Sequence, residues 1–200
     1  RVRRPQLEAF AQGFGRVPRL HLSPATTSRD EALRWFERTG GGLDGVIAKR
    51  SELPYDSATR DAMVKIKHYR SIDCVVGGFR YASKGRVVGS LLLGLFDDAG
   101  RLNHVGFTSN VPATDKPKLT REIERLRKSD AAVGFTGNAP GGPSRWATER
   151  STEWEPLPHA LVVEVTYDHY SGGRFRHGAG FLRFRPDKAP SQCTDAQLHE

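Results

Sequence analysis

Two short stretches decide how the first part of this sequence folds: LDGVIAK at residues 43–49 and MVKIK at residues 63–67. Both combine Val and Ile with charged residues, as expected for two strands of one sheet. Such a sheet brings a carboxylate and several lysines toward one pocket, which suits a polyphosphate and a divalent cation. A third stretch, RFRPDK at residues 183–188, lies so far downstream that it reaches this pocket only if a second lobe folds back over it.

The composition limits the class of protein. The 200 residues include 31 Lys and Arg against 23 Asp and Glu, which gives a formal net charge of +8. This basic balance favours polyanionic partners, nucleic acid above all, although a basic globular protein without such a role remains open. The length allows one large domain or two small ones.

The sequence carries no membrane or targeting signal. No apolar run approaches the roughly 20 residues needed to span a bilayer, so no membrane partner is expected. The chain begins RVRR without an initiator Met or an apolar segment, which predicts no signal peptide and favours an internal fragment boundary. Cys74 and Cys193 lack zinc-ligand spacing and indicate a reducing setting, so we expect a cytoplasmic, nucleoid-associated protein.

The first part of the chain predicts two helices followed by two strands. Residues 3–10 favour a short helix, and Ser28 begins a second helix through a Ser-x-x-Glu capping box. Three glycines at residues 40–42 end that helix. The strand predicted at residues 46–48 is entered through an Asp-Gly turn, and the strand at residues 63–67 follows after a polar loop.

The second part predicts a small β-barrel. Five apolar stretches separated by turn signals predict strands, and one stretch with Leu and Ile at helical spacing predicts a helix. The strands are expected at residues 72–79, 87–96, 102–107, 160–167 and 180–184, and the helix at residues 115–128. Five short strands with one inserted helix are typical of the OB fold. The predicted class is therefore α+β, with a domain boundary near residues 68–71.

Asp44 has two interpretations. An Asp-Gly pair before a strand is a turn signal, and a purely structural role remains open. As a hard oxygen ligand, Asp44 is also a candidate for binding Mg²⁺ or Mn²⁺, and magnesium needs few protein carboxylates because it keeps several waters. Lys49 closes the same strand and, by alternation, belongs to the opposite face from Asp44.

Lys65 and Lys67 are two residues apart, so both project from one face of their strand. The pair could protect an edge strand from aggregation. It could instead direct two ammonium groups at a phosphoryl centre, where fixed positive charge stabilises developing negative charge.

The last predicted strand ends in a charged run. Its charged side chains are Arg183, Arg185, Asp187 and Lys188. A solvated strand end is one interpretation of this run. Guanidinium forks also bind phosphate oxygens bidentately, so the run is a candidate polyphosphate clamp.

Together these stretches resemble the covalent nucleotidyltransferases. DGVIAK at residues 44–49 is similar to their motif IV, KIK at residues 65–67 to motif V, and FLRFRPDK at residues 181–188 to motif VI. The surrounding text RVRRPQLE, GSLLLGLFDDAGRLNHVG and VEVTYDHYSGGRFRHG is similar to bacterial ATP-dependent DNA ligases of the C and D types. The resemblance covers essentially the whole chain and corresponds to the C-terminal part of such an enzyme.

The resemblance implies a reaction in three steps. ATP adenylates an active-site lysine, AMP passes to a 5′-phosphate at a nick, and the 3′-hydroxyl displaces AMP. Asp44 would bind the metal, Lys65 and Lys67 would contact the α-phosphate of ATP, and Lys49 would join this nucleotide-binding set. The residues that would orient the pyrophosphate leaving group are Arg183, Arg185, Asp187 and Lys188.

The resemblance also implies a fragment. No KxDG element with the nucleophilic lysine occurs in the sequence. Residues 1–69 would be the distal part of an adenylyltransferase domain with an ATP-grasp-like antiparallel sheet, and residues 70–200 would be an OB domain. Because the upstream part is missing, we do not expect this chain to adenylate itself.

Two other functions remain open. OB folds bind nucleic acid through basic grooves, so the chain could be a non-catalytic module in which Arg80, Lys84 and Arg86 contact the DNA backbone. RNA-ligating and RNA-capping relatives share motifs IV and V. In the DNA ligase interpretation, the partner is nicked duplex DNA and the protein is expected to be a monomer.

Overall fold

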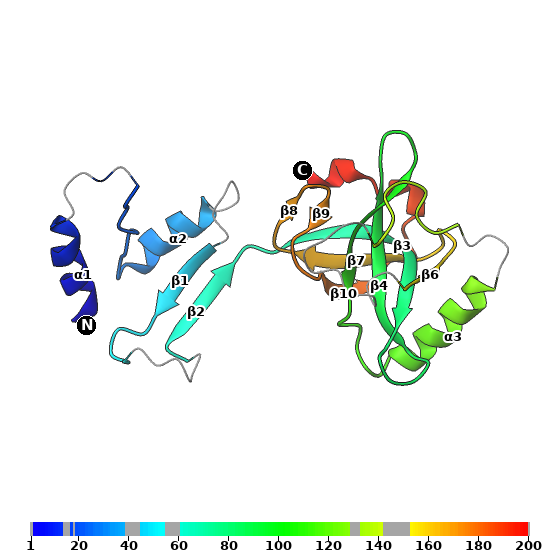
Figure 1. The fold of residues 1–200 in the computed structure, drawn as a ribbon, viewed down its shortest axis with the longest axis horizontal. Helices are drawn as coiled ribbons and strands as arrows, with labels where there is room; N and C mark the ends of the chain where they lie inside the picture. The colour runs from blue at the N-terminus through cyan, green and yellow to red at the C-terminus, as the bar shows by residue number, and fades with distance from the viewer. Residues whose placement is uncertain are drawn as a thin grey trace. The chain divides into compact units, whose positions relative to one another are not determined.

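The computed structural model describes residues 2–13, 17, 19–38, 45–54, 61–128, 133–141 and 153–199. The chain divides into two compact units, Arg1–His68 and Tyr69–Glu200. Both units combine helices with antiparallel strands (Figure 1), which confirms the predicted α+β class.

The first unit contains two helices and a two-stranded ribbon. These elements are α1 (Arg3–Gln12), α2 (Arg29–Glu37), β1 (Gly45–Lys49) and β2 (Met63–Lys67). Helix α2 begins as predicted, because the Ser28 hydroxyl accepts a hydrogen bond from the backbone N–H of Glu31 at 3.3 Å. The Glu31 carboxylate accepts a hydrogen bond from Thr26 Oγ1 at 2.6 Å, so its partner is not the backbone of the capping residue.

Strands β1 and β2 pair antiparallel, with Gly45 opposite Lys67 and Lys49 opposite Met63, which confirms that the two stretches share one sheet. The ribbon leaves apolar side chains accessible: Val64 is 56% and Ile66 is 42% exposed. None of the described residues before Tyr69 is buried. The described part of the first unit therefore has no apolar core.

The second unit is built on one curled antiparallel sheet. Its strands are β3 (Arg70–Tyr81), β4 (Val88–Phe96), β5 (Leu102–Thr108), β6 (Glu155–Pro156), β7 (Val162–Tyr167) and β10 (Gly180–Phe184). The order is β10-β7-β3-β4-β5, with β6 also paired to β3. The N–H of Ala179, next to β10, donates to the carbonyl of Phe107 on β5 at 2.8 Å, so the two ends of the sheet meet as in a barrel.

Strand β6 adds to the five predicted strands. Strand β3 is 12 residues long, and β7 pairs with it only as far as Val75. Farther along the same edge, β6 pairs with Gly78 and Phe79. Strand β6 thus satisfies backbone groups of β3 that β7 does not reach.

A short hairpin was also not predicted. Strands β8 (Tyr170–Ser171) and β9 (Arg174–Phe175) are joined by Gly172 and Gly173, whose φ angles are +59° and +78°. Positive φ at both central residues is the geometry of a type I′ turn, which glycine adopts without steric cost. Two 3₁₀ helices, η1 (Pro190–Gln192) and η2 (Asp195–Leu198), follow the last strand.

Helix α3 (Lys116–Arg127) lies against β4 (Figure 1) and occurs where the helical spacing predicts it. Its Leu119 and Ile123 side chains are buried in the barrel core. The Thr120 hydroxyl accepts a hydrogen bond from the N–H of Val88 at 3.1 Å, which ties the helix to the start of β4. Within the described ranges, no helix has the length and apolar character needed to cross a membrane.

Candidate functional site

Lys49, Lys65 and Lys67 lie on one face of the β1–β2 ribbon. Lys65 is paired with Ile47 and Lys67 with Gly45, and paired residues of an antiparallel ladder project to the same side. Lys49 follows Ile47 by two residues, so it shares that side. The ribbon thus brings three ammonium-bearing side chains to one surface, as the nucleotide-binding prediction requires.

Gly45 explains the Asp-Gly signal at the start of this ribbon. Its φ is +145°, and a Cβ atom there would lie 2.0 Å from the carbonyl oxygen of Ile66. Only glycine allows so close an approach of the two strands. Asp44, the predicted metal ligand, lies outside the described residues. Among the residues that the structure describes, no group of three or more His, Cys, Asp or Glu side chains could hold a metal ion.

The second set of predicted residues belongs to a row of charges across three strands of the barrel. Asp73 on β3 pairs with Glu164 on β7, and Glu164 pairs in turn with Arg183 on β10. A bulge between Phe181 and Arg183 places Arg183 rather than Leu182 beside Glu164. The Arg183 Nε donates to Glu164 Oε2 at 2.6 Å. The register of the three strands therefore places the carboxylates of Asp73 and Glu164 on β3 and β7 and the guanidinium of Arg183 on β10.

Asp73 is the most shielded member of this charged cluster. Its side chain is only 10% exposed, within a strand whose residues from Ile72 to Phe79 are buried. Arg185 Nη1 donates to both Asp73 oxygens at 3.0 Å, and Lys188 Nζ donates to Oδ2 at 2.7 Å. A carboxylate in such a place needs cationic partners, because an unpaired buried charge is strongly destabilising.

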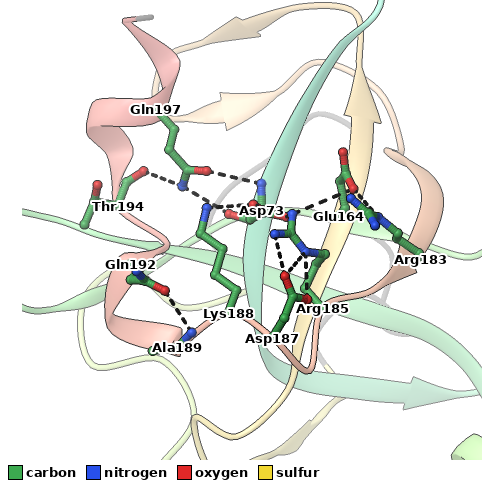
Figure 2. A network of polar contacts seen from close by, with 10 residues as sticks. All are labelled: Asp73, Glu164, Arg183, Arg185, Asp187, Lys188, Ala189, Gln192, Thr194 and Gln197. Atoms are coloured by element: carbon green, nitrogen blue, oxygen red, sulfur yellow. Dashed lines mark hydrogen bonds and ion pairs between the residues drawn. The ribbon is translucent and has the colours of Figure 1, made fainter.

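Arg185 links the shielded carboxylate to an exposed one. Its Nε and Nη2 donate to the Asp187 carboxylate at 2.9–3.2 Å, while Nη1 is turned toward Asp73. The hydrogen bonds from Arg185 are the main reason why the pKa of Asp187 falls to about 2. The same pairing raises the pKa of Arg185. Figure 2 shows Arg185 and Lys188 converging on Asp73 while Arg183 reaches Glu164.

The whole cluster is formally neutral. Three cations face three carboxylates, namely Arg183, Arg185 and Lys188 against Asp73, Glu164 and Asp187. The charges of the predicted polyphosphate clamp are thus already compensated by carboxylates of the same unit. Arg183 and Asp187 remain open to solvent, with side chains 65% and 63% exposed. The structure brings the four predicted residues together and divides them into a shielded and an exposed pair.

The three residues predicted to contact DNA occupy different environments. Lys84 is exposed in the turn between β3 and β4. Arg86 Nε donates to Glu124 of α3 at 3.1 Å, and its guanidinium lies 5.6 Å from the ring centre of Tyr81. Arg80 is partly buried, and burial lowers its pKa. Lys84 and Arg86 are therefore both exposed, Arg86 with Glu124 as an ion-pair partner, whereas Arg80 is partly covered.

Several residues of the cluster escaped the sequence analysis. Asp73 stands in the apolar run IDCVVGGF, and a charge in such a run signals a need for partners. Glu164 carries a weaker signal of the same kind, as the only charge in VVEVTY. Gln197 bonds the Asp73 backbone from the C-terminal segment, and no local pattern indicates this contact.

Comparison with known proteins places these observations in a family. Residues 84–188 match the family described as ATP dependent DNA ligase C terminal region. The chain is 43% identical over 206 residues to DNA ligase C1 of Mycolicibacterium smegmatis, covering 99% of the chain and 56% of that protein. It is 42% identical over 190 residues to DNA ligase C of Mycobacterium tuberculosis, covering 90% of the chain and 53% of that protein.

A solved structure agrees with this assignment. The crystal structure of the ligase domain of M. tuberculosis LigD has a TM-score of 0.52 and 28% identity, covering 74% of this chain and 46% of that one. The chain spans about half the length of the curated relatives it matches. Because the match covers more than half of the sequence, the chain belongs to the family of ATP-dependent DNA ligase C-terminal regions.

Proposed function

We propose that the chain is the C-terminal portion of an ATP-dependent DNA ligase that seals nicks in duplex DNA. Family membership and the identity with DNA ligase C1 support this proposal. The observation that carries it is the common face of Lys49, Lys65 and Lys67 on the β1–β2 ribbon. Residues 1–69 would be the distal part of the adenylyltransferase domain, and residues 70–200 the OB domain.

In the first step of the proposed reaction, a lysine amine attacks the α-phosphorus of ATP and pyrophosphate leaves. Lys65 and Lys67, together with Lys49, would contact the nucleotide phosphates, because fixed ammonium groups stabilise charge that develops on them. Arg183, Arg185, Asp187 and Lys188 would orient the pyrophosphate. Asp44 would hold Mg²⁺ or Mn²⁺, which supplies Lewis-acid stabilisation of the phosphoryl oxygens when bound.

The next two steps act on DNA. AMP passes from the lysine to the 5′-phosphate at the nick, and the 3′-hydroxyl then attacks that phosphorus, forming the phosphodiester bond and releasing AMP. Lys84, Arg86 and Arg80 would contact the phosphate backbone through the turn and strand around them. We propose that the protein works as a monomer on nicked duplex DNA in the cytoplasm, associated with the nucleoid.

The proposal includes an upstream partner segment. The sequence holds no KxDG lysine, and the described part of the first unit has no buried residue. The exposed Val64 and Ile66 would then pack against the remainder of the adenylyltransferase domain, in the same polypeptide or supplied separately. On this account the chain alone does not form lysyl-AMP.

A chimaeric enzyme tests the proposal. The chain replaces the matching region of DNA ligase C1, and sealing of a labelled nicked duplex is measured with ATP and Mg²⁺. We expect ATP-dependent sealing, and we expect the Lys65→Ala, Lys67→Ala double variant to lose lysine adenylation. A matched control is Lys118→Ala, which removes an exposed lysine of α3. A well-folded chimaera without sealing activity would contradict the proposal.

The chain by itself provides the complementary measurement. Incubation with radiolabelled ATP and Mg²⁺ should leave no acid-stable adenylate on the polypeptide, because the nucleophilic lysine is absent from the sequence. An adenylate on this chain would show that our account of the missing nucleophile is wrong. Sealing of an RNA nick in preference to a DNA nick by the chimaera would favour the RNA-ligating alternative.

A further inference from the structure

The backbone of Asp73 is fixed by the side chain of Gln197 from the C-terminal segment. Strand β4 pairs with β3 only from Val75 onward, so the backbone of Asp73 extends past that neighbour. Gln197 takes the place of a strand there: its Oε1 accepts from Asp73 N–H at 3.3 Å, and its Nε2 donates to the Asp73 carbonyl at 3.2 Å. The same Nε2 donates to the Thr194 carbonyl at 3.0 Å. The C-terminal segment thus fixes the position of this carboxylate.

The cations of the cluster differ in how many of their N–H donors are already used by carboxylates. All three guanidinium nitrogens of Arg185 donate to carboxylate oxygens, Nη1 to Asp73 and the other two to Asp187. Each guanidinium nitrogen of this side chain is therefore engaged by a carboxylate. Lys188 has three N–H donors and uses one of them on Asp73. Arg183 directs its Nε to Glu164 and is largely exposed.

We infer that Asp73 is a positioning residue for the pyrophosphate-binding cations, an inference that rests on the proposed ligase function. Asp73 fixes Arg185 as a brace within the barrel and aims Lys188 at the surface of the cluster. Lys188 and Arg183 keep N–H donors for phosphate oxygens, whereas Arg185 acts through Asp187 rather than on the ligand. Gln197 supports the same arrangement by fixing the backbone of Asp73.

This inference makes a prediction that depends on the reaction step. Pyrophosphate is the leaving group of the lysine adenylation step. It takes no part in the sealing of a nick that is already adenylated. In the chimaera with DNA ligase C1, Asp73→Asn should slow lysine adenylation by about 10- to 100-fold, the cost of misplacing a binding group by roughly 1 Å. Sealing of a pre-adenylated nicked duplex should change less than about threefold, well under the effect of such misplacement.

Controls separate positioning from a general loss of structure. Asp168→Asn removes a carboxylate of similar exposure, 14%, which contacts His177 at 2.9 Å, and it should leave the ratio of the two rates unchanged. Asp73→Glu keeps the charge and should recover part of the adenylation rate. The effects of Asp73→Asn and Lys188→Met on adenylation should be non-additive, because the two residues act as one unit.

The isolated chain provides an independent arm. Solvent exchange of the Arg185 Nη1–H that donates to Asp73, followed by NMR, should be slow in the unchanged chain and at least tenfold faster with Asp73→Asn, because the brace is released. Equal loss of both rates in the chimaera, no loss of adenylation, or unchanged exchange of this N–H would each overturn the inference. A chimaera that performs neither step before any substitution would contradict the proposed function instead, and the exchange measurement would still decide the role of Asp73.

Discussion

A buried titratable side chain, His104, affects how the stability of the second unit responds to pH. His104 is buried, and its Nδ1 lies 3.0 Å from Arg174 Nη2. A guanidinium can only donate, so Nδ1 accepts and the neutral ring carries its proton on Nε2. Burial, followed by the nearby positive charges of Arg174 and Arg80, lowers the pKa of His104 from 6.5 to about 3. The folded barrel therefore holds this histidine neutral.

This shift predicts a loss of stability in mild acid. Below pH 6.5 the unfolded chain binds a proton at His104 that the folded chain does not bind until about pH 3. The free energy of unfolding should therefore fall by up to about 1.4 kcal/mol per pH unit across that window. In His104→Asn an amide oxygen can still accept a hydrogen bond from Arg174 but cannot titrate. The difference in free energy of unfolding between the unchanged chain and His104→Asn should therefore shrink by about 2 kcal/mol from pH 7.5 to pH 5.

Urea denaturation of the second unit at both pH values measures this difference. His199→Asn, which changes an exposed histidine, should keep the pH dependence of the unchanged chain. If His104→Asn kept the same pH dependence as the unchanged chain, His104 would not be the group that titrates.

The residues of the motifs could be predicted from the sequence, but their ion-pair partners could not. The charged ends of motifs IV, V and VI carry local patterns, so their residues could be named in advance. Asp73 binds Arg185 and Lys188 across sequence separations of 112 and 115 residues. Which carboxylate meets which cation depends on the register of three strands and on one bulge. Such pairings are set by tertiary structure and leave no mark in a short window of sequence.

At the scale of elements, the barrel followed its sequence closely because its strands are apolar runs bounded by turn signals. The predicted strand at residues 180–184 and the helix at residues 115–128 agree with β10 and α3 to within one residue at each end. Strand β6 was missed because two residues, one of them Pro156, show no periodicity. Its existence depends on the length of β3, which offers an unpaired edge beyond β7.

Packing of α3 on the barrel gives a prediction at this scale. Ile123 is fully buried, so Ile123→Ala should lower the free energy of unfolding of the second unit by about 2–5 kcal/mol through lost burial and the cavity left behind. Arg121→Ala, on the exposed side of the same helix, should change it by less than about 0.5 kcal/mol. Chemical denaturation of the two variants checks this contrast. Equal, small effects would mean that α3 does not contribute to the core.

The whole molecule consists of two units with very different means of stabilisation. The second unit has a continuous apolar core drawn from its sheet and α3, including Phe79, Leu91 and Ile123. The first unit, in its described ranges, has helices and a ribbon whose apolar residues are only partly covered. Since burial of apolar surface is the main favourable contribution to folding, stability should concentrate in the second unit.

Limited proteolysis tests this asymmetry. We expect trypsin to cut first within residues 1–68 and to leave a resistant fragment that begins close to Tyr69, since cleavage follows local opening and opening costs least where little is buried. Mass spectrometry of a digestion time course identifies the cuts.

In the chimaera the same residues should become resistant, because the remainder of the adenylyltransferase domain would cover Val64 and Ile66. Ile123→Ala should speed digestion of the resistant fragment alone. Early cuts between β3 and β10, with residues 1–68 intact, would show that the first unit is the more stable part and would remove the reason for expecting an upstream segment to complete it.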